Sequence, residues 1–192
     1  MIKYPTKKGD YARPSVGVKN RGMALEKLID ESNAHYLREG HAVIHKKPTP
    51  VQIVRVDYPA REKAKIVEAY YKIPSTTDYN GVYRGVYIDF DVKETRNKTA
   101  FPINNVHAHQ IDHLKAVDAQ GGVAFLLIRF VHHGTVHLLP YQALKTFVAR
   151  AETGRKSIAY DELKQEGIAI DVGYRPAVDY LRAVDALLKG RP

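Results

Sequence analysis

The segment at residues 123–131 constrains the fold more than any other part of the chain. It reads Val-Ala-Phe-Leu-Leu-Ile-Arg-Phe-Val, with Arg129 as its only polar residue. The run is too short to span a bilayer but has the length of a strand. A nearly continuous apolar strand is typical of the centre of a sheet that is covered on both faces. We therefore expect a sheet packed between two layers.

The other elements are predicted from apolar spacing and from turn residues. Helices are expected at residues 20–39, 103–119, 141–151, 161–165 and 176–188, and strands at residues 41–45, 78–83, 86–93, 123–131 and 135–139. This order predicts an α/β fold with a mixed central sheet flanked by helices. A chain of 192 residues fits one domain better than two.

Two segments stand apart from this core. Residues 1–19 are basic and rich in Gly and Pro, which predicts a flexible N-terminal arm before a single domain at residues 20–192. Residues 46–77 contain Pro48, Pro50, Pro59 and Pro74 and read as a basic insertion that projects like a stalk. Within it we expect a strand at residues 51–56 and a helix at residues 60–71.

The net charge of +9 favours a polyanionic partner, nucleic acid before an anionic membrane. The chain has no Cys, which excludes disulfides and Cys-ligated zinc. We see neither a leader pattern nor a run long enough to cross a membrane, and we expect a cytoplasmic protein without a membrane partner.

The chemically informative stretch is residues 86–93, Val-Tyr-Ile-Asp-Phe-Asp-Val-Lys. Because strand side chains alternate between faces, Asp89, Asp91 and Lys93 share one face and the apolar residues share the other. Asp78, on the preceding strand of the expected hairpin, can reach the same patch. Carboxylates so close together repel each other unless a cation lies between them, and Mg²⁺ prefers oxygen ligands. Ordinary alternation, with acids facing water, is the simpler alternative.

Asp78 followed by Asp91-Val92-Lys93 is similar to the motif of PD-(D/E)xK nucleases. A longer resemblance spans most of the chain from Asn20 onward. The blocks that resemble the RecU family of Holliday junction resolvases, in sequence and order, are residues 20–23 (Asn-Arg-Gly-Met), 45–50 (His-Lys-Lys-Pro-Thr-Pro), 76–81 (Thr-Thr-Asp-Tyr-Asn-Gly), 93–95 (Lys-Glu-Thr) and 107–110 (His-Ala-His-Gln).

This resemblance implies a restriction-endonuclease-like core that acts as a homodimer and nicks four-way DNA junctions symmetrically with Mg²⁺ or Mn²⁺. It implies metal contacts from Thr76, Asp78, Asp91 and Gln110, and transition-state stabilisation by Lys93. The family usually has Glu at the position of Asp91, whose side chain is one methylene shorter. A RecA-type recombinase is a further candidate partner.

Several polar residues have a simpler explanation beside the functional one. Gln110 lies in an apolar stripe of its expected helix, where an amide needs a partner, either a metal or a neighbouring strand. His109 and His113 have the i, i+4 spacing of a zinc pair, but Gln110 stands where a zinc protease has Glu, so phosphate contact or packing on the sheet is favoured. Glu26 is either a helical carboxylate near the metal or a solvent-facing charge.

The rival hypothesis is a basic DNA-binding or architectural protein without catalysis. It explains the charge, the arm and the insertion, but it does not explain why Asp78, Asp91 and Lys93 converge.

Overall fold

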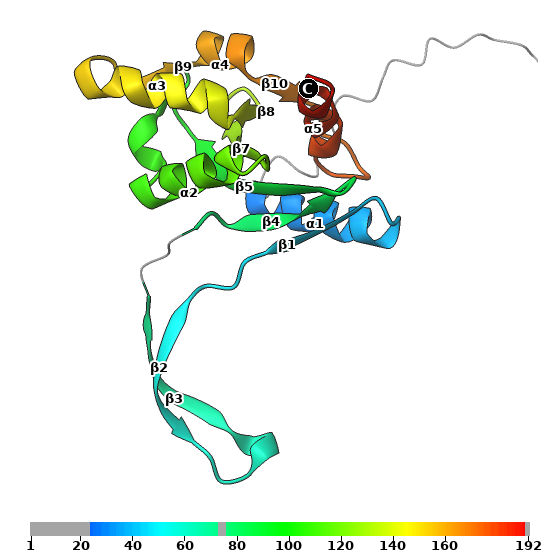
Figure 1. Ribbon diagram of the computed structural model, residues 1–192, viewed down its shortest axis with the longest axis vertical. Coiled ribbons are helices and arrows are strands. Elements are labelled where there is room, and N and C mark those ends of the chain that lie inside the picture. Colours follow the sequence, from blue (N-terminus) through cyan, green and yellow to red (C-terminus); the bar gives the residue numbers. More distant parts are fainter. Residues whose placement is uncertain (1–23, 73–75, 191–192) are drawn as a thin grey trace, which may run out of the picture.

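The computed structural model describes residues 24–72 and 76–190. The predicted arm at residues 1–19 lies outside them. The centre of the molecule is a mixed six-stranded sheet in the order β1-β4-β5-β7-β8-β10 (Figure 1). Its strands are β1 (Ala42–Lys46), β4 (Tyr79–Tyr83), β5 (Val86–Thr95), β7 (Val123–Phe130), β8 (Thr135–Pro140) and β10 (Ile168–Ile170).

The helices cover both faces of this sheet, which confirms the predicted fold class. They are α1 (Leu25–Arg38), α2 (Ala108–Ala119), α3 (Tyr141–Thr153), α4 (Tyr160–Glu166) and α5 (Tyr180–Lys189), with a short 3₁₀ turn η3 (Ile103–Asn105). A two-stranded sheet of β6 (Ala100–Pro102) and β9 (Ser157–Ala159) supports α3 and α4.

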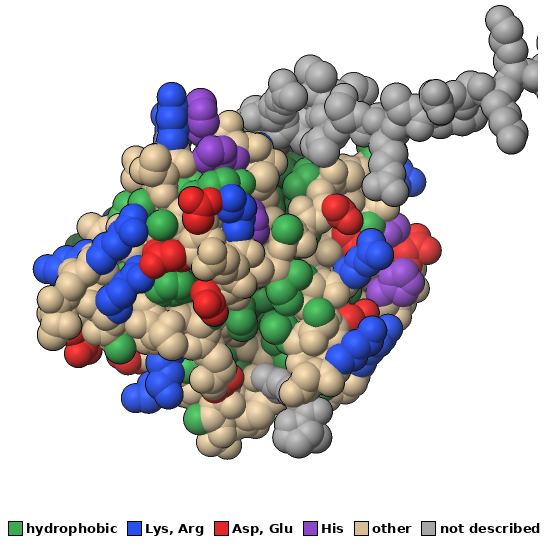
Figure 2. All heavy atoms as spheres, turned by 90° about the horizontal axis from the view of Figure 1, so that it is seen from above, with side chains coloured by type: hydrophobic (Ala, Val, Ile, Leu, Met, Phe, Trp, Pro, Cys, Tyr) green, Lys and Arg blue, Asp and Glu red, His purple; other side chains and the backbone are tan. Residues whose placement is uncertain are grey.

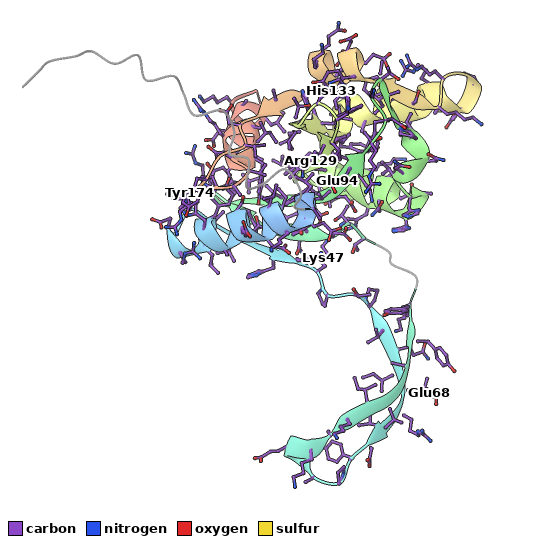
Figure 3. The ribbon with its side chains drawn as sticks, turned by 180° about the vertical axis from the view of Figure 1, so that it is seen from behind. Lys47, Glu68, Glu94, Arg129, His133 and Tyr174 are labelled. Carbon is purple, nitrogen blue, oxygen red and sulfur yellow. The ribbon has the colours of Figure 1, made fainter. Side chains whose placement is uncertain are left out.

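Two apolar clusters form the core, one on each face of the sheet. In the first, Phe90 of β5 stacks on Tyr79 and on Phe125, beneath α1 and α5. In the second, Leu126 and Ile128 of β7 pack with the residues of α2, α3 and α4. Every residue of β7 is buried, as the apolar run predicts. Its one polar residue, Arg129, forms an ion pair of 3.2 Å with Glu94 on the adjacent strand (Figure 3).

The hairpin of β4 and β5 turns at Arg84 and Gly85, as predicted. Both have positive φ, 50° and 76°, which suits a two-residue hairpin turn. On β4, Gly81 allows β1 to approach, since a Cβ there would stand 2.1 Å from the backbone oxygen of Val43. β5 then pairs in parallel with β7, and α2 forms the connection between them.

The insertion leaves the core as a separate hairpin (Figure 1). We call β2 (Val51–Asp57), the turn η2 (Arg61–Lys63) and β3 (Lys65–Tyr71) the stalk. β2 and β3 pair only with each other, and every residue of β2 is exposed. The predicted helix at residues 60–71 is wrong. No core covers this segment, so apolar spacing carries no information about a buried face, and the β-branched and aromatic residues of β3 favour pairing with β2.

Three predicted helices begin later than expected. The helix expected from residue 20 is α1, which begins at Leu25 after the non-helical Ala24. The helix expected from residue 103 opens as η3, and α2 begins only at Ala108. The helix expected from Pro176 begins at Tyr180, because Val178 is held in a bridge to Val172 and donates its backbone N–H to Ser32. In the part of the chain that the structure describes, no helix has the length and apolar character needed to cross a membrane.

Candidate active site

The polar row of β5 is buried between the sheet and α2. Asp89 and Asp91 have no exposed surface, and the side chain of Lys93 is 16% exposed. The alternative of acids facing water is therefore wrong. Because a buried charge is costly unless it is paired, each of these carboxylates has to find partners within the fold.

Asp91 meets Lys93 and Gln110. Lys93 Nζ lies 2.9 Å from Asp91 Oδ1. The side-chain amide of Gln110, from the first turn of α2, donates to Asp91 Oδ2, and its oxygen accepts the backbone N–H of His107 at 3.1 Å. Gln110 thus caps its own helix while it fixes the carboxylate. Of the two partners expected for the Gln110 amide, a metal or a neighbouring strand, the structure shows a hydrogen bond to Asp91 of strand β5.

Asp78 lies directly before β4, one residue from the Tyr79–Phe90 pair of the ladder, and so beside Asp91. Burial is the main cause that raises the pKa of Asp91 above its usual range. The charge of Lys93 opposes this shift, and the charge of Asp78 adds to it. Two carboxylates therefore repel each other at this edge, as the spacing in the sequence predicts.

The donor set of this pair fits a hard divalent cation. Asp91 Oδ1 contacts Lys93 Nζ at 2.9 Å, and because a carboxylate oxygen carries two lone pairs, this oxygen can still coordinate a cation. Within residues 24–72 and 76–190, no three or more His, Asp or Glu side chains are arranged so that they alone could hold a metal ion. Mg²⁺ retains several waters and is often bound by one or two carboxylates, so Asp78 and Asp91 meet its needs.

The other residues implied by the resemblance lie nearby but differ in their contacts. Thr76 lies two residues before Asp78, and its hydroxyl donates to the backbone oxygen of Thr77 at 3.2 Å. Glu26 forms an ion pair of 2.5 Å with Lys46, and the two side chains are about half exposed. Glu26 also lines a hollow with Asp78 at the root of the stalk. The metal roles of Thr76, Asp78, Asp91 and Gln110 stay predictions, as does the catalytic role of Lys93.

A second buried carboxylate, Asp89, has a role that sequence reasoning missed. It accepts hydrogen bonds from Lys47 Nζ and from the hydroxyl of Tyr87, each at 2.8 Å, and from the hydroxyl of Thr77. His113 Nε2 lies 3.0 Å away. The alternation of β5 already placed Asp89 beside Asp91, but nothing in the sequence pattern linked it to Lys47. His113 packs on the sheet, one of the two roles expected for it.

The fold and the site together define a mixed α/β protein with two carboxylates and a lysine on adjacent strands of the sheet, as in the PD-(D/E)xK class. The family model of RecU, Recombination protein U, matches residues 20–186. The chain belongs to the RecU family.

Curated relatives support this membership. Two proteins of Staphylococcus aureus, from strains MRSA252 and JH9, are each named Holliday junction resolvase RecU. Each is 56% identical over 169 residues, which cover 88% of this chain and 81% of the relative. Among solved structures, Hjc of Archaeoglobus fulgidus, a Holliday junction resolvase from an archaeal hyperthermophile, aligns with a TM-score of 0.41 at 11% identity, over 76% of this chain and 91% of that one.

Proposed function

We propose that this protein is a Holliday junction resolvase, a metal-dependent endonuclease that makes paired symmetric nicks in four-way DNA junctions during recombination and repair. The observation that carries the proposal is the fully buried Asp91, whose carboxylate contacts Lys93 and lies within the electrostatic influence of Asp78. The names of the Staphylococcus aureus relatives support the same activity. We place it in the cytoplasm on the sequence alone.

Asp78 and Asp91, with Thr76 and Gln110 beside them, would hold Mg²⁺, for which Mn²⁺ can substitute. A bound divalent cation of this kind lowers the pKa of water and polarises a phosphoryl oxygen. Lys93 supplies an ammonium at the edge of the site, where negative charge grows on the phosphate as the bond to the leaving oxygen breaks. Gln110 keeps the carboxylate of Asp91 oriented from the opposite side.

The charge distribution supports DNA binding through the stalk. Lys46, Lys47, Arg55, Arg61, Lys63, Lys65 and Lys72 stand in or beside it, against Asp57, Glu62 and Glu68. At the opposite end of the molecule, Lys and Arg side chains are mixed with Asp and Glu (Figure 2). We propose that two copies form a two-fold dimer, because a four-way junction with two symmetric nicks needs two sites related in that way. A RecA-type recombinase is a further proposed partner.

The test is incubation with a synthetic four-way junction, with and without Mg²⁺. We expect symmetric nicks that require the metal, and Asp78→Asn should abolish them while it leaves junction affinity unchanged, because phosphates are held by basic side chains. Binding without cleavage by the unaltered protein would instead favour the rival, a basic DNA-binding or architectural protein. Sedimentation of the free protein tests the dimer.

A further inference from the structure

The stalk joins the core through two connections, and their described residues 48–50 and 76–77 form no ladder of backbone hydrogen bonds. The last such bond of the core runs from Lys47 N to the backbone oxygen of Asp78, 2.7 Å, and the first of the stalk from Lys72 N to that of Pro50, 3.0 Å. On the outgoing connection, Pro48 and Pro50 have no N–H to donate. The sheet therefore does not continue into the stalk, and other contacts must set its direction.

One buried carboxylate contacts both connections. Lys47, the last residue before the outgoing connection, places Nζ 2.8 Å from Asp89 Oδ2 (Figure 3). Thr77, on the returning connection, donates its hydroxyl to Asp89 Oδ1. The two also contact each other, with 3.0 Å between Lys47 Nζ and Thr77 Oγ1. The residues at which the two connections leave and re-enter the core thus meet at a single side chain.

Asp89 is itself held by the core. Its backbone belongs to β5, between β4 and β7, and its carboxylate is also contacted by Tyr87 of the same strand and by His113 of α2. It has no exposed surface. Charge-assisted hydrogen bonds in such surroundings are stronger than on the surface and define one geometry. Asp89 also stands two residues from Asp91, on the same face of the strand.

We propose that Asp89 is a positioning residue that fixes the direction of the stalk relative to the strand carrying Asp91 and Lys93. Lys47 and Thr77 are the two points of attachment. A junction engaged by the stalk is then presented to the site in one register, so that the same phosphate reaches Asp91 each time. This second step rests on the proposed function, whereas the fixed direction of the stalk does not.

The direction can be measured without any cleavage. The chain has no Cys, so Glu62→Cys in the stalk and Lys115→Cys on α2 accept two spin labels at defined, exposed positions. Labelled protein is diluted into an excess of unlabelled protein, and the distance distribution is recorded by pulsed electron resonance. We expect a narrow distribution, which Lys47→Met and Thr77→Val each broaden.

Lys46→Met is the matched control. Lys46 is the neighbouring lysine and also forms an ion pair, but its backbone lies within the ladder of β1 and β4 and its partner is Glu26. We expect this control to leave the distribution unchanged. Equal distributions in the unaltered protein and in both attachment variants would overturn the proposal, as would equal broadening by the control. Two attachment variants are used so that one poorly folded protein does not decide the result.

The consequence for register is read from the positions of the nicks. On a junction of fixed sequence, Lys47→Met should spread the nicks to neighbouring phosphates and slow the main one by about tenfold or more, as misplacement of a reacting group does. A slower reaction at an unchanged position would assign Lys47 to chemistry and overturn the positioning role. If the unaltered protein makes no nicks at all, the proposed function fails, while the distance measurement still decides whether the stalk is held.

Discussion

Asp89 and Asp91 lie two residues apart on one strand and are both fully buried, but their surroundings differ. Four side chains meet the carboxylate of Asp89, including a lysine. The side chains that contact the carboxylate of Asp91 are one lysine and one amide, and its pKa is raised. A buried carboxylate that accepts hydrogen bonds from several side chains contributes to structure. A buried carboxylate with fewer side-chain partners and a raised pKa is a candidate metal ligand.

Lys93→Ala should slow single-turnover cleavage of a four-way junction by about a hundredfold or more, the usual effect of losing one electrostatic donor. The substitution leaves intact the ion pair between Glu94 and Arg129, the buried cation on the neighbouring strand β7. Thermal melting of the variant serves as the control for folding. Cleavage at the full rate would remove Lys93 from the mechanism.

Asp91→Asn should abolish cleavage and raise the melting temperature at neutral pH. Burial raises the pKa of Asp91 in the folded state above its value in the unfolded chain. The folded protein therefore loses stability as pH rises from the unfolded to the folded pKa, and the loss is complete above the folded pKa. The amide removes that loss, so the difference in melting temperature should vanish in acid, where Asp91 is protonated.

Asp89→Asn is the matched control for Asp91→Asn. It leaves Lys47 without its charged partner and should lower stability by about 1–3 kcal/mol. Equal effects of the two substitutions on the melting temperature would contradict the distinction between the two carboxylates.

At the residue scale, the sequence predicts the site where its members are close along the chain. The period of two on β5 and the tight hairpin place Asp78, Asp91 and Lys93 together. Lys47 and Asp89 are 42 positions apart, and their contact depends on how the stalk is attached, which no local pattern encodes. Partners of that kind are found only in the folded structure.

At the scale of elements, α3 and α4 are joined by a partly exposed network of polar contacts around Glu162. Its carboxylate accepts from Arg150 of α3 and takes the backbone N–H of Ala159 at 2.7 Å, which caps α4. Arg150 also donates to the backbone oxygen of Ser157 at 2.8 Å. One ion pair therefore closes the connection between the two helices and the small strand β9.

This network predicts a pH dependence of stability. The hydrogen bond from Arg150, and then that from Ala159, lowers the pKa of Glu162 to about 2. A lowered carboxyl pKa stabilises the fold above the pKa of the unfolded chain, and this contribution is lost as pH falls toward the folded value. Glu162→Gln should therefore melt earlier than the unaltered protein at neutral pH and equally in strong acid. A difference in melting temperature that stays constant from neutral pH to strong acid would exclude this pH dependence.

Most elements with a buried face were predicted, although the three-residue strands β6, β9 and β10 were missed. In the stalk, the strand expected at residues 51–56 is confirmed as β2, but β3 was not predicted. Buried β7, the hairpin of β4 and β5, and helices α3 and α4 follow from apolar period and turn residues. β3 was predicted as a helix because Ala64, Val67 and Tyr71 have helical spacing. In the structure these residues contact no core, so the period had no physical meaning there.

At the scale of the whole molecule, we propose that the stalk selects the four-way junction and that the core sheet carries the cleavage site. Replacing residues 51–72 by a short Gly-Ser linker should reduce affinity for a four-way junction more than affinity for linear duplex, because the open centre of a junction can admit a projecting hairpin. Both affinities are measured at one fixed salt concentration. If the variant prefers junction over duplex as strongly as the unaltered protein does, the stalk does not select junctions. If the variant is monomeric, the stalk is instead assigned to packing between subunits.

The free-standing stalk also has a consequence for how the chain folds. β1 and β4 pair across the whole insertion, so their contact closes a long loop, and the entropy of closure grows with the length of flexible chain. If the β2–β3 hairpin of the stalk forms early through its local contacts, it brings the ends of β1 and β4 together before these two strands pair. Refolding after denaturant dilution should then be slower when an unstructured Gly-Ser segment of equal length replaces the stalk than it is in the unaltered protein. The same hairpin would thus guide the assembly of the sheet in the newly made chain.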